Sequence, residues 1–426
     1  MKNQRNLSII GATFYGNRGA EAMLSTTIGE TYRCAGDISL KFNLFSYYPK
    51  QDQRISANAD VSIYSSKPMC LVTVLLPCAL LYKIFHFCRM NSLKKILPKS
   101  ILSLAKSDAL VCLAGVSFVH GRAKFLPFNV ATILPAILLG VPVIKFSQAL
   151  GPFQGFLNRI LAKFFLLRCQ KIFTRGNYTH NYVKGLLTRH NNYERADDVA
   201  FLFNTQYNFS YTNKLLNDEL SQLQEQSKTG RLIIGLCPSV VVAKKAKSAG
   251  WDYDKFIINL IIAIVELGFT VAFYPNATRA EEMHALHNND LPLLERIYQQ
   301  LPSHISTYVV LFSGSLNARQ IYQIINGCDI HIVSRFHAMV AALSCALPVL
   351  VIGWSHKYLE VMESFGQADM VLDFKAGELN SVLVSLRKLI DERQARRSVI
   401  AAKKPAVLDL AGSQIKYLIN FLERSS

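Results

Sequence analysis

The sequence predicts an α/β protein made of two Rossmann-like domains, each built on a parallel sheet, with a cleft between them. Short apolar runs rich in β-branched residues alternate with helix-length segments, a pattern typical of parallel strands joined by right-handed crossovers. The alternation occurs in two series separated by a polar stretch at 203–230. With 426 residues, the chain is also longer than one hydrophobic core usually supports.

The first series extends from the amino terminus to residue 202. The run DALVCLAG at 108–115 is apolar after its first residue, as expected of a parallel strand buried on both faces. We expect helices from about Glu21, at 131–140 and at 154–169, and strands at 7–12, 42–48, 61–66, 108–115, 141–152 and 171–174.

The second series follows 203–230, which we expect to be a linker with a surface helix. FIINLIIAIVELG at 256–268 predicts a helix closed by glycine. A further helix is expected at 317–328, a last one at 415–426, and strands at 231–240 with its loop, 269–276, 306–314 and 329–334. The predicted domains are 1–202 and 231–390, followed by C-terminal helices at 391–426.

The formal net charge of +18 favours anionic partners. We interpret the basic residues as spread along the chain, with local clusters at 94–99, 244–247 and 396–404. No basic run is interleaved with aromatic residues in the manner of a nucleic-acid-binding module, so we expect no nucleic-acid partner.

The segment PMCLVTVLLPCALLY at 68–82 has no charged residue and is followed by Lys83, Arg89, Lys94, Lys95 and Lys99. It is shorter than the ~20 residues that span a bilayer, and Pro77 interrupts it. Two interpretations stay open: a buried helix or hairpin under the first domain, or a membrane-surface element that is apolar inward and basic at its edges.

Nine cysteines, an odd number without a CxxC pair, indicate free thiols in a reducing compartment. The apolar stretch at the amino terminus is too short for a signal peptide. We therefore expect a cytoplasmic protein.

The strongest candidate site is the end of the strand at 329–334. Ser334 is a natural helix N-cap, and Arg335 and His337 then fall in the first helical turn, where unpaired backbone N–H groups favour an anion. Arg335 adds a fork suited to phosphate or carboxylate, and His337 a proton shuttle. The alternative is structural: Arg335 pairs with a neighbouring acid and His337 is a satisfied buried histidine.

Other strand ends carry weaker candidates. Gly16 and Gly19 in the loop 13–23 allow close backbone approach, although this loop is neither GxGxxG nor a P-loop and a plain turn is equally compatible. The candidate polar residues that we place at strand ends are Asn17, Glu21, Ser117, His120, Arg122, Arg175 and Lys357.

Two further patterns carry no site. His284 and His287 are spaced as on one helix face, but no Cys or carboxylate is placed to complete a metal site, so we expect surface residues and no metal. No GxSxG or cysteine–histidine constellation indicates a covalent nucleophile.

The chain resembles the polysaccharide pyruvyl transferase family from about residue 7 to 370. The resemblance rests on four matches in order: FYGNRGAEAML (14–24), DALVCLAGVS (108–117), KIFTR (171–175) with DDVAF (197–201), and VSRFHAMVAALSCALPVLVIGWSHKY (333–358). The family often has Gly-Asp-Glu-Ala where this chain has Gly-Ala20-Glu-Ala, and three glycines where it has Ala114-Gly115-Val116.

The resemblance implies a glycosyltransferase-B-like fold and transfer of pyruvate from phosphoenolpyruvate to two hydroxyls of a sugar, with a ketal formed and phosphate released. It implies donor binding and acid–base chemistry at Arg335 and His337 in the second domain, and an acceptor side with Arg175 in the first. No cofactor is required. A saccharide acceptor, whether free or lipid-linked, is the implied partner, and a lipid-linked one would suit a protein at the inner face of an anionic membrane.

Two alternatives of other classes stay open. A glycosyltransferase with a nucleotide-sugar donor would share the fold and would need a carboxylate for the ribose, for which Glu360 and Glu363 are placed after the main motif. A non-catalytic family member is compatible with the alanine at position 20.

Overall fold

The computed structural model describes residues 4–424 except 57, 122, 208, 210–215, 285–287 and 377. The chain forms two compact units that are not consecutive in sequence. Unit 1 comprises Met1–Phe14, Met23–Phe209 and Leu408–Ser426, and unit 2 comprises Tyr15–Ala22 and Ser210–Val407. The expected bounds differ from these units: Tyr15–Ala22 groups with the second unit, the C-terminal segment Leu408–Ser426 groups with the first, and the expected linker 203–230 is divided between the two.

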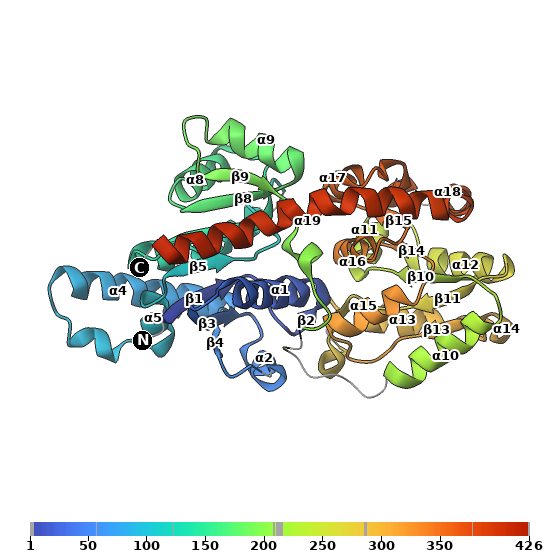
Figure 1. Cartoon of the computed structure of the whole chain (residues 1–426), viewed down its shortest axis with the longest axis horizontal. Helices are drawn as coiled ribbons and strands as arrows, with labels where there is room; N and C mark the ends of the chain where they lie inside the picture. The colour runs from blue at the N-terminus through green and yellow to red at the C-terminus, as the bar shows by residue number, and fades with distance from the viewer. Residues whose placement is uncertain are drawn as a thin grey trace. The chain divides into compact units, whose positions relative to one another are not determined.

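Unit 1 contains a parallel sheet with the Rossmann strand order (Figure 1). The order is β4-β3-β1-β5-β7-β8-β9, with the short β6 beside β7. The bounds are β1 Gln4–Ile10, β3 Ser39–Ser46, β4 Val61–Ser65, β5 Ala109–Cys112, β6 Val116–Ser117, β7 Val143–Leu150, β8 Lys171–Arg175 and β9 Tyr193–Ala196. Every residue of β5 and β7 is buried, which confirms strands covered on both faces.

Helices cover both faces of this sheet. One face packs on a single hydrophobic cluster, to which most of these helices contribute. The helices that follow the strands of unit 1 are α1 Arg18–Cys34, α2 Pro49–Ile55, α3 Pro68–Cys70, α4 Leu76–Phe87, α5 Lys99–Ala105, α6 Leu126–Ala131, α7 Leu134–Leu139, α8 Phe156–Leu166 and α9 Gly176–Leu186. On the other face Phe173 contacts Phe146 and Tyr417, and Tyr417 belongs to the long helix α19 (Arg393–Arg424).

Unit 2 repeats the Rossmann order in a six-stranded parallel sheet, β13-β11-β10-β14-β15-β16. Its strands are β10 Ile233–Cys237, β11 Thr270–Phe273, β13 Val309–Leu311, β14 Ile330–Val333, β15 Val349–Gly353 and β16 Val371–Asp373. Its helices are α10 Leu216–Lys228, α11 Val240–Ser248, α12 Tyr253–Glu266, α13 Leu291–Tyr298, α14 Ser303–Ser306, α15 Ala318–Asn326, α16 Phe336–Ser344, α17 His356–Ser364 and α18 Leu379–Asp391.

The predicted fold class is confirmed, and the differences are local. The helix expected at 131–140 is the shorter α7, which follows α6, and each of these helices has a proline in its first turn. The strands β9 and β16 were not predicted. Both are short edge strands, and β16 has only three residues, so neither shows a clear apolar period.

The segment Pro68–Phe87 is helical, with a π-helical turn (η1, Leu71–Leu75) between α3 and α4. By length and composition alone it is long and apolar enough to cross a membrane. In the structure only one stripe of it is buried, at Leu71, Leu75 and Ala79. The opposite side is exposed, so the segment is not the fully buried helix of the first interpretation.

Candidate active site

The candidate site lies where the strand order of the second sheet reverses, between β10 and β14. Ligands of open α/β sheets bind at such a switch point, beyond the carboxyl ends of the strands. After β10, Ser239 caps α11 by accepting a hydrogen bond from the Val241 N–H. After β14, Ser334 and Arg335 lead into α16.

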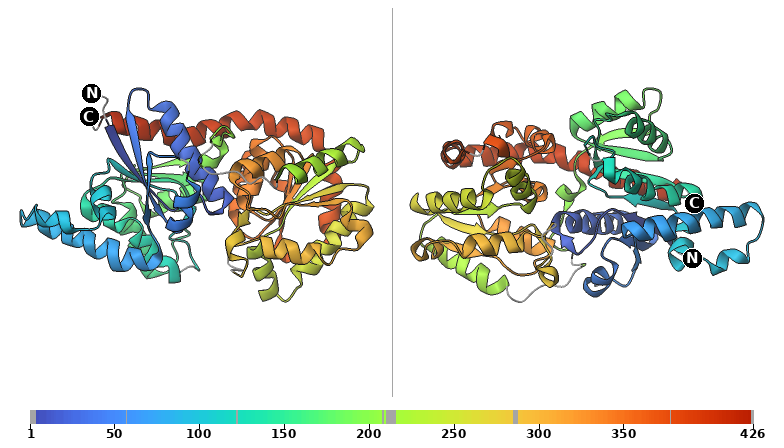
Figure 2. Two further views of the ribbon diagram at one scale, coloured as in Figure 1. Left: turned by 90° about the horizontal axis from the view of Figure 1, so that it is seen from below. Right: turned by 180° about the vertical axis from the view of Figure 1, so that it is seen from behind.

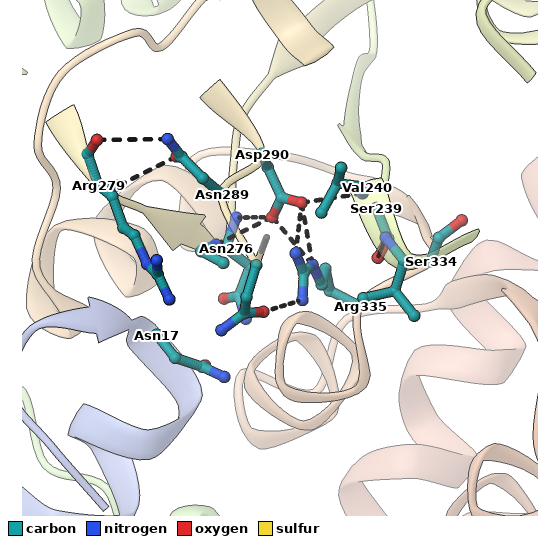
Figure 3. Close-up of polar contacts among 12 residues, drawn as sticks. Asn17, Ser239, Val240, Asn276, Arg279, Asn289, Asp290, Ser334 and Arg335 are labelled. Atoms are coloured by element: carbon teal, nitrogen blue, oxygen red, sulfur yellow. Dashed lines mark hydrogen bonds and ion pairs between the residues drawn. The ribbon is translucent and has the colours of Figure 1, made fainter. Parts of the chain in front are cut away.

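Arg335 forms a buried ion pair with Asp290 (Figure 3). Its Nε lies 2.9 Å and its Nη2 2.5 Å from the two carboxylate oxygens, and Nη1 donates to Asn288 Oδ1 at 2.9 Å. Burial opposes the charge on Arg335, but the charge and hydrogen bonds of Asp290 outweigh it and raise the pKa of the guanidinium. Arg335 therefore does have the neighbouring acid that the structural alternative required.

Asp290 also organises the surrounding backbone. Its carboxylate accepts hydrogen bonds from the N–H groups of Val240 at 3.0 Å, Ala277 at 3.0 Å and Asn276 at 3.3 Å. The side chain is completely buried. A single carboxylate thus ties the start of α11, the loop after β11 and the start of α16 together.

Ser334 was expected to cap α16, and this prediction is wrong. The N-cap residue is Arg335, and among the described residues no side chain caps this helix. The Ser334 hydroxyl instead accepts a hydrogen bond from the Tyr253 hydroxyl at 3.2 Å, while burial raises the pKa of Tyr253 and keeps it a donor. The start of α16 therefore has no side-chain cap, and the positive end of its dipole favours an anion there.

The first glycine loop belongs to this same site. Its strand β2 (Gly16–Asn17) pairs antiparallel with β12 (Ala277–Thr278), and the Arg18 N–H donates to the Asn276 carbonyl at 3.1 Å. Asn17 caps α1 through its side-chain oxygen, which accepts from the N–H groups of Gly19 and Ala20 at 3.0 and 3.4 Å. Arg279, beyond β12, is nearly buried, and in Figure 3 its guanidinium points toward the loop of Asn17.

Gly19 is packed directly against His337. A β-carbon built on Gly19 would lie 2.1 Å from both Cγ and Nδ1 of the imidazole. The ring also contacts Phe336 edge-on, with the centroids 5.1 Å apart. The close backbone approach predicted for Gly19 is therefore an approach to the candidate catalytic histidine.

Glu21 joins α1 to α15. Its Oε2 accepts a hydrogen bond from Arg18 Nη1 at 2.7 Å and another from the Ala318 N–H at 3.0 Å. Both members of this ion pair are buried. These contacts describe a structural carboxylate at the start of α15, beside the capping box of Asn317 and Gln320.

Lys357, in the first turn of α17, lies close to the start of α16. Its Nζ lies 4.9 Å from the ring centroid of Phe336, the first residue of α16, and 5.1 and 5.3 Å from those of Trp354 and Tyr358. Unit 2 therefore gathers Asn17, Glu21, Ser334, Arg335, His337 and Lys357.

Arg175 and His120 lie in unit 1. Arg175 is the last residue of β8 and forms a buried pair with Asp198 at 2.7 Å, while also donating to the Gly115 carbonyl at 3.2 Å. His120 is exposed and lines a surface depression of about 630 Å³ that Lys124 and Phe156 also border. Ser117 is buried and donates to Gln148, and Arg122 lies outside the described residues.

Arg18 belongs to the polar first loop, but four other site residues were not predicted from the sequence, namely Asn276, Arg279, Asn288 and Asp290. The available signal was that a buried arginine needs an acid. Asp290 stands in an Asn-Asn-Asp-Leu-Pro stretch that is typical of a turn into a helix, here α13. The sequence does not indicate which of the 29 acidic residues pairs with Arg335, because Asp290 and Arg335 lie 45 residues apart.

Of the histidine pair set aside above, the structure describes only His284. His284 is exposed in a turn rather than on a helix, and His287 lies outside the described residues. Within the part of the chain that the structure describes, no cluster of three or more histidine, cysteine or acidic side chains is arranged to hold a metal ion.

The profile of the family described as polysaccharide pyruvyl transferase matches residues 28–356, which is most of the chain. The chain belongs to this family. The amylovoran biosynthesis protein AmsJ of Erwinia amylovora is 22% identical to this pyruvyl transferase family member over 303 residues, 70% of each chain.

Solved structures of other proteins have the same fold as this chain. The S. aureus MnaA–UDP structure matches 98% of this chain and 97% of its own, with a TM-score of 0.60 and 12% identity. A UDP-glucose:anthocyanidin 3-O-glucosyltransferase bound to UDP matches all of both chains, with a TM-score of 0.59 and 13% identity. The fold is glycosyltransferase-B-like, as the resemblance implied.

Proposed function

We propose that this protein transfers the pyruvyl group of phosphoenolpyruvate to two hydroxyls of one sugar in a cell-surface polysaccharide or its lipid-linked precursor. The observation that carries the proposal is His337, held at the uncapped start of α16 by contact with Gly19. Proton transfer to an anionic donor requires an acid–base side chain next to a site that attracts the anion. A histidine at a helix N-terminus provides both.

Donor binding is assigned to the start of α16 and to Lys357. Phosphoenolpyruvate carries a phosphate and a carboxylate, and both suit backbone N–H groups and a lysine. The charge of Arg335 is balanced by Asp290, so its first role in this scheme is to fix the start of the helix. A guanidinium has five N–H donors, and Asp290 and Asn288 accept from some of those of Arg335. Any contact of Arg335 with the donor substrate uses the remaining N–H groups.

The reaction needs three steps at the donor. His337 gives a proton to the methylene carbon, which becomes a methyl group and leaves the neighbouring carbon cationic. A sugar hydroxyl attacks that carbon, and its proton returns to the histidine. The second hydroxyl then attacks the same carbon, the carbon–oxygen bond to phosphate breaks, and phosphate departs with the second proton.

Thermal unfolding with candidate donors tests the proposal. Phosphoenolpyruvate at about 100 times its Kd should stabilise the protein by about 2.7 kcal/mol, whereas UDP-sugars should have no effect. Stabilisation by a UDP-sugar and not by phosphoenolpyruvate would point to the glycosyltransferase alternative, with Glu360 as the residue to examine. Stabilisation by neither would favour a non-catalytic family member.

Two variants separate binding from chemistry. His337→Asn should retain the stabilisation by phosphoenolpyruvate and lose phosphate release in the presence of a panel of sugars and glycolipids. Arg335→Lys keeps a charge beside Asp290 but loses the bidentate geometry, so it should weaken donor binding. Wild-type phosphate release by His337→Asn would remove the histidine from the mechanism.

A further inference from the structure

The excess positive charge of the chain is concentrated in unit 1, rather than spread as the local clusters alone indicate. Residues 61–193 contain 17 lysines and arginines and a single acid, Asp108, so they account for +16 of the net charge of +18. Asp108 is bound to Arg5 at 3.0 Å. A surface built from this stretch is therefore strongly attractive to anions.

The same stretch exposes large apolar side chains on the α4 segment. One stripe, formed by Leu71, Leu75 and Ala79, packs on the hydrophobic cluster of unit 1. On the opposite side Phe87 is 88% exposed and Ile96, in the short helix η2 (Leu93–Ile96), 74%. Met69, Leu80, Leu81 and Ile84 are exposed as well.

A second exposed apolar face lies on α8. Phe156 is 83% exposed, and Leu157, Ile160 and Phe164 continue the same side of the helix at helical spacing. The exposed Arg159 and Lys163 alternate with them, and the guanidinium of Arg168 stacks on Phe164 at 3.4 Å. This is the pattern of an amphipathic helix that lies in a membrane interface.

The two faces belong to one layer of unit 1. Residues of η1, α4 and α8 contribute to the same hydrophobic cluster, and α6 contacts both η1 and α8. In Figures 1 and 2 the α4 segment projects at the edge of unit 1. We call the exposed apolar residues of the α4 segment, η2 and α8, with the cations between them, the apolar–basic face.

We propose that the apolar–basic face docks unit 1 on an anionic phospholipid bilayer, lying flat at its surface. Lys83, Arg89 and Lys95 are exposed around the apolar side chains of the α4 segment, and no acid occurs from residue 61 to 107. This charge complementarity favours anionic headgroups over a second copy of the same basic face. The buried stripe of η1 and α4 argues against a spanning helix, because crossing the bilayer would remove it from the core.

Binding to lipid vesicles tests the proposal without any donor or acceptor, so its result is independent of the proposed function. The full-length protein should co-sediment with vesicles of phosphatidylcholine mixed with phosphatidylglycerol, and much less with phosphatidylcholine alone. High salt should weaken binding, and alkaline carbonate should release the protein. Failure to bind the anionic vesicles, or resistance to carbonate extraction, would overturn flat docking.

Matched variants locate the surface. Phe87→Ser with Phe156→Ser, and separately Lys83→Glu with Lys95→Glu, should each weaken vesicle binding by about tenfold or more. Val384→Ser, at a position 68% exposed on α18 of unit 2, and Lys255→Glu on α12 should leave it unchanged. Unchanged binding by both double variants would contradict the proposal. So would a dimer that the Phe87 and Phe156 changes dissociate and that does not bind vesicles.

Discussion

At the scale of single residues, two histidines six positions apart have opposite environments. His331 lies inside β14, completely buried, with Nε2 at 3.1 Å from the Ile325 carbonyl and Nδ1 at 3.2 Å from the Tyr274 hydroxyl. Burial lowers the pKa of His331 to about 4, so it stays neutral near pH 7. His337 stands at a helix start beyond the strand end, and only this position suits proton transfer to a ligand.

Gly19 gives the first residue-scale prediction. Gly19→Ala places a methyl group within 2.1 Å of the His337 ring, so either the ring or the start of α1 must move. We expect a loss of about 1–3 kcal/mol in the free energy of unfolding, as in other overpacked sites, together with weaker stabilisation by phosphoenolpyruvate. Chemical denaturation with and without this ligand measures both effects.

The control for this change is Gly185→Ala in α9. A β-carbon there meets open space, and alanine is the better helix former. Gly185→Ala should be neutral or slightly stabilising. Equal stability of the Gly19 and Gly185 variants would show that the contact with His337 does not constrain the loop.

At the scale of elements, the sequence predicted best what depends on local pattern. The strand at 329–334 and the helix after it were found because apolar periodicity and the strand-end rule are local signals. The capping role of Ser334 was wrong, because the buried Tyr253 hydroxyl competes for that side chain from 81 residues away. The acidic partner of Arg335 could not be predicted either, because it too lies far away in the sequence.

Glu21 provides the element-scale prediction, since it couples the start of α1 to the start of α15. Glu21→Ala leaves Arg18 as a buried charge and the Ala318 N–H without its acceptor. Removing one partner of a buried ion pair costs about 3–5 kcal/mol. Glu21→Gln keeps an oxygen for the Ala318 N–H and should cost less.

Equilibrium unfolding in denaturant compares these two variants with Glu225→Ala. Glu225 is bound to Lys228 in an exposed pair, both side chains being 69% exposed, and such pairs contribute about 1 kcal/mol or less. The predicted order of destabilisation is Glu21→Ala, then Glu21→Gln, then Glu225→Ala. A Glu21→Ala protein as stable as Glu225→Ala would contradict the structural role of Glu21.

At the scale of the whole molecule, fold class and strand order follow from the repeated strand–helix pattern. The division of the chain into unit 1 and unit 2 does not follow from that pattern. Both sheets adopt the Rossmann order because successive crossovers of one hand leave few alternatives. The membership of Tyr15–Ala22 and of Leu408–Ser426 depends on contacts far apart in sequence. Apolar periodicity carries no information on such contacts, and that is why the sequence placed Tyr15–Ala22 with the first domain and gave the C-terminal helices no domain.

Gln414 tests the second of these assignments. It is completely buried on α19, its side-chain oxygen accepts from the Ser147 N–H at 2.6 Å, and its amide donates to the Asp197 carbonyl at 2.9 Å. Gln414→Ala leaves these two backbone groups of unit 1 without their partner, at a cost of about 1–3 kcal/mol each. The exposed Gln394→Ala on the same helix is the control and should change little.

Two spectroscopic signals assign the loss to a unit. Both tryptophans, Trp251 and Trp354, lie in unit 2, so their fluorescence follows that unit, whereas circular dichroism follows the helices of both. Gln414→Ala should lower the unfolding midpoint measured by circular dichroism and move the tryptophan transition less. A shift confined to the tryptophan signal would mean that α19 stabilises unit 2 at this position, because unit 1 would then have unfolded no earlier than in the wild type.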